Sequence, residues 1–137
     1  MRRFEVIEHT ADSGIVAYGR DKRELFANAA YGLFSLISDL ERVGKSYSRE
    51  VVVTGADDEE MLVEWLNELI FLFDVERVLL KRFHIAELDG RLRATVFGER
   101  IDESRHSIDM APKATTYHML RVERTTEGWR AQVIFDI

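Results

Sequence analysis

Side chains able to bind a cation or move a proton gather in a short stretch near the N-terminus, residues 8–14. His9 lies three residues before Asp12, between two segments predicted to be strands, 4–8 and 14–19. Functional side chains often lie on such a connection, because the flanking strands hold it in place. The alternative is an ordinary turn in which an Asp side chain hydrogen-bonds to the backbone. The spacing of these residues leaves both interpretations open.

A second group of carboxylates lies at the other end of the chain. A strand is predicted to end at Asp136, and the α-carboxylate of Ile137 follows one residue later. If this strand pairs within a sheet, both carboxylates are held in fixed places and repel one another. A divalent cation relieves that repulsion, and ligation by oxygen atoms alone suits Ca²⁺ or Mg²⁺. The competing interpretation is a frayed acidic end.

Two further polar clusters are candidates for binding. The loop 98–109 carries charges of both signs, and Arg105 within it could bind a phosphate or the carboxylate of a partner. A solvated charged loop is the competing interpretation. Lys113, Tyr117 and His118 lie at the head of a predicted strand. Strand alternation predicts that Tyr117 and His118 point to opposite faces, so at most one of them joins a given site.

Two helices are predicted to position these groups. The D-x-x-E pattern at 21–24 is typical of a helix start, and an apolar stripe then continues through Ile37. A second helix is predicted from a cap at Asp57 or Asp58 to Asp74. Its second half is apolar nearly all round, which predicts burial between layers or under a partner.

The remaining segments predict strands and antiparallel hairpins. Alternating or β-branched side chains mark them as 50–54, 78–88, 91–97, 115–123 and 129–136. Asp89-Gly90 is the signal of a two-residue hairpin turn, and 124–128 predicts a longer hairpin loop. Helices early and hairpins late predict the α+β class. We expect a single layer-packed domain over 1–137, in which two helices pack on a mostly antiparallel sheet.

Length and composition narrow the possible functions. A chain of 137 residues with 46% apolar residues can bury a stable core without disulfides or structural metal ions. No cysteine is present, which excludes disulfides, thiolate metal sites and thiol nucleophiles. No apolar run follows Arg2-Arg3 and none is long enough to span a bilayer, so we expect a cytoplasmic protein. The net charge of −6 favours a protein, metal ion or small molecule over tight nucleic-acid binding.

Taken together, the polar and apolar segments resemble the archease family. The matching segments follow in order along nearly the whole chain: E-H-T-A-D at 8–12, A-Y-G at 17–19, L-V-E-W-L-N-E-L at 62–69, L-F-D at 72–74, G-E-R-I-D at 98–102, R-H at 105–106, K-A-T-T-Y-H at 113–118 and V-I-F-D-I at 133–137. Two positions depart from the family pattern. Ser13 stands where an apolar residue is expected, and Pro112 precedes the lysine in place of an unconstrained residue.

The resemblance implies an accessory protein rather than an enzyme. Archeases act on the RNA ligase that seals tRNA exon halves, which joins 3′-phosphate or 2′,3′-cyclic phosphate ends to 5′-hydroxyl ends. They promote transfer of GMP to the active-site histidine of that ligase, allow multiple turnover and can broaden its use of nucleotides. The resemblance therefore implies a protein partner, contact with tRNA only through that partner, and no membrane.

The resemblance also implies a divalent metal site. Its ligands would be Asp12, Asp136 and the terminal carboxylate of Ile137, with calcium as the metal in crystals and magnesium or manganese as alternatives. Lys113 is a further functional candidate, and one interpretation of His9 is that it orients Asp12. Other candidates lie in the matching segments: Arg105, His106 and His118.

Two other functions remain open from the sequence. A metal-dependent hydrolase or nuclease would activate a water on a metal. It would draw on His9, Asp12, His106, His118 and Asp136, with at least two of the histidines within ligand distance of the carboxylates. A chaperone-like modulator of RNA-modifying enzymes would instead use an exposed apolar surface, such as 71–73. A buried second helix would weaken that alternative.

Overall fold

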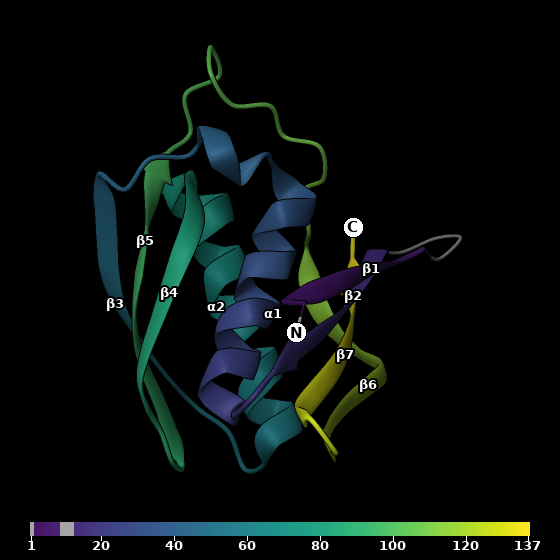
Figure 1. Ribbon diagram of the computed structural model, residues 1–137. Helices are drawn as coiled ribbons and strands as arrows, with labels where there is room; N and C mark the ends of the chain where they lie inside the picture. Colours follow the sequence, from purple (N-terminus) through teal and green to yellow (C-terminus); the bar gives the residue numbers. More distant parts are fainter. Residues whose placement is uncertain (1, 9–12) are drawn as a thin grey trace.

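Two α-helices lie between two antiparallel sheets in the computed structural model, which describes residues 2–8 and 13–137 (Figure 1). The elements follow in the order β1 (Phe4–Glu8), β2 (Ser13–Gly19), α1 (Lys22–Ile37), the short 3-10 helix η1 (Leu40–Arg42), β3 (Tyr47–Thr54), α2 (Asp58–Glu76), β4 (Val78–Leu88), β5 (Arg91–Arg100), β6 (Ala114–Thr125) and β7 (Gly128–Asp136). The predicted α+β class is confirmed. The strands form two sheets rather than one, and each covers one side of the helices.

The sheets differ in how the chain builds them. One has the strand order β3-β5-β4 and comes from a continuous stretch of sequence. The other has the order β1-β2-β7-β6, so it joins the two ends of the chain. The predicted turn at Asp89-Gly90 connects β4 to β5, and Gly90 has the positive φ of 71° that such turns need.

Side-chain caps start both helices where the sequence predicts. Asp21 accepts a hydrogen bond from the backbone N–H of Glu24, at 2.8 Å. Asp57 accepts one from the N–H of Glu60, also at 2.8 Å, which decides between the two predicted caps of α2. These caps satisfy backbone donors that the first helical turn leaves without partners. None of the described helices is long and apolar enough to cross a membrane.

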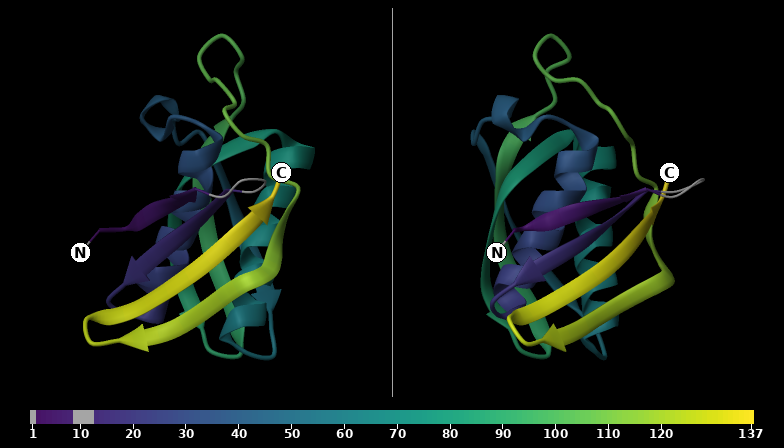
Figure 2. Two further views of the ribbon diagram at one scale, coloured as in Figure 1. Left: turned by 90° about the vertical axis from the view of Figure 1, so that its right-hand side faces the viewer. Right: turned by 45° about the vertical axis from the view of Figure 1, so that its right-hand side comes forward.

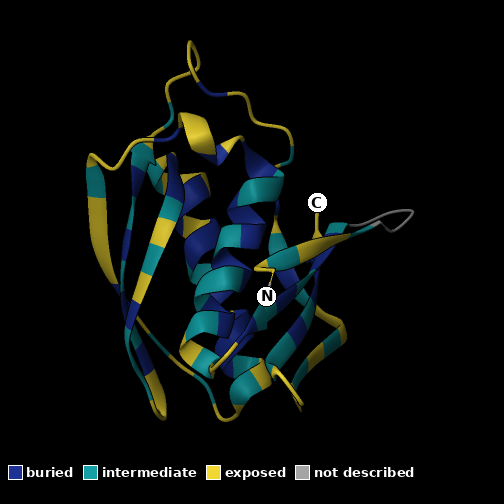
Figure 3. Ribbon diagram, in the orientation of Figure 1, coloured by how far each residue is buried: buried dark blue, intermediate teal, exposed yellow. Residues whose placement is uncertain are grey.

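The helices carry the core between the sheets (Figure 3). Trp65 of α2 is fully buried, and its indole N–H donates to the backbone oxygen of Phe26 in α1 at 3.0 Å. The second half of α2 is buried between the layers, as predicted, except along one stripe. Phe71 and Val75 are 51% and 58% exposed on that stripe.

Three predicted features of the strands are wrong. β5 continues to Arg100 because β4 pairs with it that far, so the loop begins later than predicted. The β6–β7 connection is a two-residue turn rather than a five-residue loop, because Thr125 and Gly128 already pair. The register of β6 also shifts between Thr116 and Arg121, and strict alternation fails there. Tyr117 and His118 lie in this stretch and are both exposed.

Candidate functional site

Three strands of the four-stranded sheet meet where β7 ends (Figure 2). Phe135 pairs with Ser13 at the start of β2, and Asp136 pairs with Ala114 at the start of β6. The backbone N–H of Lys113 donates to the carbonyl oxygen of Asp136 at 2.7 Å. In this sheet β2 lies between β1 and β7. Segments from both ends of the chain, together with residue 113, therefore meet at one end of the strands. We call this end of the sheet, which carries Asp136 and Ile137, the carboxylate edge.

The side chains at this edge are accessible from solvent. Asp136, Ile137 and Lys113 are all exposed. Ser13, to which Asp12 is covalently bonded, pairs with both Glu8 and Phe135. The structure therefore brings Lys113 and Asp136 together, whereas the predictions for His9 and Asp12 lie outside the described residues.

The metal-site prediction rests on donors that the described side chains only partly supply. Within residues 2–8 and 13–137, no three His, Asp or Glu side chains lie close enough together to hold a metal ion. The predicted set has one described side chain, Asp136; Ile137 would contribute a terminal carboxylate, and Asp12 lies outside the described residues. Asp136 fits the role as an exposed carboxylate at a strand end, a hard oxygen donor of the kind that Ca²⁺ and Mg²⁺ prefer. The metal site stays a prediction.

Lys113 also borders a groove between α2 and the segment that leads into β6. The groove has a volume of about 640 Å³ and is lined by Asn67, Ile70, Phe71, Asp74, Ala111, Pro112, Lys113 and Ala114. Asn67 accepts a hydrogen bond from the N–H of Thr115 at 2.7 Å, which attaches the start of β6 to the middle of α2. Pro112 is buried. The backbone N–H groups of Lys113 and Thr115 are both held by hydrogen bonds, despite the unusual proline.

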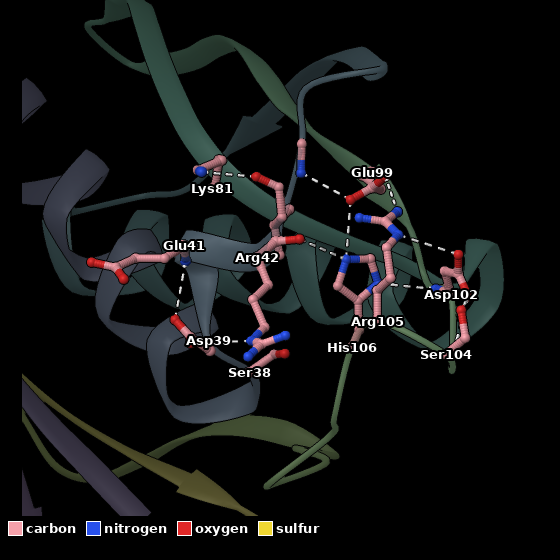
Figure 4. A network of polar contacts seen from close by, with 12 residues as sticks. Ser38, Asp39, Glu41, Arg42, Lys81, Glu99, Asp102, Ser104, Arg105 and His106 are labelled. Carbon is pink, nitrogen blue, oxygen red and sulfur yellow. Dashed lines mark hydrogen bonds and ion pairs between the residues drawn. The ribbon is translucent and has the colours of Figure 1, made fainter.

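Arg105 and His106 take part in a different cluster, at the end of β5 (Figure 4). Glu99 is its centre. It accepts hydrogen bonds from Arg105, from the N–H of Gly44 at 2.9 Å, and is 3.0 Å from His106 Nε2. The hydrogen bond from Arg105, followed by that from Gly44, lowers the pKa of Glu99 to about 2. A carboxylate with these partners is stabilised in its charged form.

The imidazole of His106 is fully buried in this cluster. Its Nδ1 accepts a hydrogen bond from the backbone N–H of Asp102 at 3.0 Å. Nε2 is therefore the protonated nitrogen, and it lies 3.0 Å from the carbonyl oxygen of Arg42 as well as from Glu99. Both ring nitrogens are thus engaged. The cluster joins the loop after β5 to η1, which is a structural role.

Sequence reasoning missed two residues that organise these regions. Glu99 lies in the G-E-R-I-D segment, but its partner Gly44 is 55 positions away and nothing in the sequence links them. Asn67 left a faint signal, because asparagine is a poor helix former and here occupies the middle of a helix. His118 is exposed on β6.

Comparison with known proteins agrees with this fold. The archease protein family model matches residues 4–137. The chain is 39% identical to protein archease of Methanosarcina mazei, over 99% of this chain and 97% of that protein. It is 37% identical to protein archease of Pyrococcus abyssi over the whole length of both.

Two solved structures share the fold. The solution structure of Methanobacterium thermoautotrophicum protein 1598 is 37% identical, covers all of both chains and superimposes with a TM-score of 0.85. An archease from Thermotoga maritima, described as a possible chaperone, is 24% identical, with a TM-score of 0.66 over 100% of this chain and 98% of that one. The chain belongs to the archease family.

Proposed function

We propose that the protein is an accessory factor that activates a tRNA-splicing RNA ligase, and that it is not itself an enzyme. One observation carries the proposal: three archease-like segments that are distant in sequence meet at one edge of a sheet. Glu8 pairs with Ser13, Ser13 with Phe135, and Lys113 donates to Asp136. The net charge of −6 supports a protein partner rather than direct binding of RNA.

The proposed site works by charge and position rather than by a nucleophile. Asp12, Asp136 and the terminal carboxylate of Ile137 would hold a divalent cation, and calcium, magnesium and manganese all suit oxygen donors. When bound, the cation supplies positive charge toward phosphate oxygens, which favours phosphoryl transfer. Lys113 donates its backbone N–H to Asp136 at the end of β7, and its exposed side chain borders the groove beside α2.

In this proposal the protein presents the site to the ligase during guanylylation. The ligase would then accept GMP faster, complete more than one turnover and use a broader set of nucleotides. The RNA ends would meet the ligase, and the protein would meet RNA only through it.

The test is a guanylylation assay of the RNA ligase with labelled GTP, with and without this protein. We expect wild type to accelerate labelling of the ligase, and Asp136→Asn and Asp12→Asn to lose that effect while remaining folded. Asp89→Asn is the matched control, because Asn-Gly forms the same turn as Asp-Gly far from the site. Full acceleration by folded Asp136→Asn protein would refute the proposed site.

A second measurement addresses the metal and the terminal carboxylate. Calorimetry with CaCl₂ should detect binding to wild type and to Asp89→Asn, and none to Asp136→Asn. Adding Gly-Ser after Ile137 moves the terminal carboxylate, so we expect the extended protein to lose both calcium binding and activation. Unchanged calcium binding in the extended protein would remove Ile137 from the ligand set.

A chaperone-like role is a second candidate, but burial of most of the second half of α2 weakens it, and of the surface 71–73 only one side chain is exposed. Phe71 is half exposed, although Leu72 and Phe73 beside it are buried. A chaperone-like role requires that Phe71→Ser, rather than Asp136→Asn, abolishes the effect on the ligase. The hydrolase alternative has less support, because His106 is engaged by Asp102 and Glu99.

A further inference from the structure

Exposed apolar side chains occur on both α2 and β6, two elements that pack against each other. Of the large apolar side chains that are exposed in the described residues, four belong to these two elements: Phe71 at 51%, Val75 at 58%, Tyr117 at 61% and Met119 at 51%. Apolar groups that gather on a surface mark sites of interaction more often than apolar groups scattered singly. Their exposure therefore calls for a partner.

β6 runs along α2, and the groove lies beside the point where β6 begins. Asn67 is bonded to Thr115 near the middle of α2. Toward the C-terminal end of α2, Phe71 and Asp74 line the groove together with Lys113. Toward its N-terminal end, desolvation and the negative charges of Glu60 and Glu64 raise the pKa of the Tyr117 hydroxyl. We call this surface the α2–β6 face; it runs from the cap Asp57 to Val75 along α2, and from Lys113, just before β6, to Met119 within β6.

The α2–β6 face is acidic, although Lys113 borders its groove. Four carboxylates lie along it: Asp57, Glu60, Glu64 and Asp74. In the part of the chain that the structure describes, none of the four forms an ion pair, whereas their neighbour Asp58 pairs with Lys22 at 3.2 Å. Acidic groups around exposed apolar groups are complementary to a basic segment that carries apolar side chains.

The shape of β6 decides how such a segment would bind. β6 is an edge strand, which in principle can pair with an added strand. Its register breaks between Thr116 and Arg121, Met119 has a positive φ of 56°, and the carbonyl oxygen of Met119 already accepts from Gln132 at 2.9 Å. A continuous ladder cannot extend along such an edge. Binding through side chains in the groove is the arrangement that remains.

We propose that the α2–β6 face is the docking surface for a basic, amphipathic segment of the partner RNA ligase. An apolar side chain of that segment would occupy the groove beside Phe71, and its Lys or Arg side chains would face Glu64 and Asp74. Lys113 lines the groove, and its backbone N–H donates a hydrogen bond to the carbonyl oxygen of Asp136. A segment of the ligase bound in the groove would therefore lie next to the carboxylate edge. The identity of the partner rests on the proposed function. A second copy of this chain fits less well, because two acidic faces repel each other.

The test separates binding from activation. Dissociation constants of the labelled protein for the RNA ligase are measured by fluorescence anisotropy at low and high salt. Phe71→Ser and the double variant Glu64→Lys/Asp74→Lys should each raise Kd by about tenfold or more. The double variant should also bind with less salt dependence. Because all three positions are exposed, the variants should keep the circular dichroism spectrum of wild type.

The control variants make the same kinds of substitution, an apolar truncation and a charge reversal, outside the α2–β6 face. Val52→Ser removes an apolar side chain that is 48% exposed on β3, and Glu41→Lys reverses an exposed charge on η1. Both should leave Kd within about twofold of wild type, since they lie off the α2–β6 face. At saturating protein, Phe71→Ser should recover the guanylylation rate, whereas Asp136→Asn should bind normally and fail to activate.

Each outcome is decisive. Unchanged Kd for both face variants, with wild-type activation intact, would overturn the docking surface and leave the proposed function standing. A wild-type protein that neither binds nor activates the ligase would overturn both. If sedimentation shows a wild-type dimer that Phe71→Ser dissociates, the occupant is a second copy and the assignment to the ligase is wrong.

Discussion

Replacing Glu99 by Gln tests the cluster at the end of β5 more directly than any other change. The variant keeps the shape of the side chain and removes the negative charge that Arg105 and the N–H of Gly44 stabilise. We expect a folded protein that is less stable than wild type at neutral pH. The variant should also lose part of the acid sensitivity of wild type, since a protonated glutamate and a glutamine are both neutral and nearly the same shape.

The magnitude follows from the pKa of Glu99, which lies at about 2 rather than 4.5. At about 1.4 kcal/mol for each pH unit, that difference corresponds to about 3 kcal/mol at full strength. The Arg105 side chain is 48% exposed, so solvent screening reduces the contribution. We expect about 1–2 kcal/mol. Because the folded pKa is the lower one, the stabilisation is complete above the unfolded pKa and is lost as the pH falls toward the folded pKa.

The assay is urea unfolding followed by tryptophan fluorescence at several pH values. The difference in free energy of unfolding between wild type and Glu99→Gln should be constant from about pH 7 to 5.5, and fall to less than about half by about pH 3.5. Glu103→Gln is the matched control, because Glu103 is an exposed carboxylate of the same loop, and it should match wild type throughout. A difference that stays constant down to about pH 3.5 would show that charge on Glu99 is not the cause.

Three further changes test packing and hydrogen bonding. Thr115→Val should be neutral or stabilise by up to about 1 kcal/mol, because the buried Oγ1 of Thr115 has no hydrogen-bond partner among the described residues. Thr116→Val removes a hydroxyl that donates to the carbonyl oxygen of Ile134 at 2.9 Å, so it should cost about 1 kcal/mol in thermal unfolding. Gly98→Ala should destabilise by about 3 kcal/mol or more, since its Cβ would lie 1.9 Å from a carbonyl oxygen of β4. Gly44→Ala, whose nearest contact is 3.5 Å, should be tolerated in the same urea titration. Trp65→Phe removes a buried hydrogen bond to a carbonyl oxygen of α1 and leaves space in the core, so calorimetry should show a loss of about 2 kcal/mol or more.

Local chemistry explains what the sequence could predict. Asp21 and Asp57 cap their helices as expected, because a cap needs only a side-chain oxygen and an N–H three residues later. The Asp89-Gly90 turn is equally local. The five-residue loop predicted at 124–128 fails because Gly128 begins β7 with a positive φ of 148°, which sequence alone did not reveal.

Features set by distant pairing were less predictable. Nothing local indicates that β7 lies between β2 and β6, or that the strands divide into two sheets. The site shares this property. The adjacency of Lys113 and Asp136 depends on a strand register, and the burial of His106 depends on Arg42 and Glu99. Side-chain type could nominate these residues, but only tertiary packing could sort them into separate clusters.

The two sheets also differ in when they can form as the chain folds. Residues 47–100 supply every strand of the β3-β5-β4 sheet, together with α2, so this unit forms from nearby contacts. Pairing Ser13 with Phe135 must instead close a loop around that unit, which is entropically slower. We therefore expect the carboxylate edge to form late during folding and to open early during local unfolding. In hydrogen exchange, amides of β2 and β7 should lose protection together while those of β5 remain protected, so the carboxylate edge exists only in the fully assembled protein.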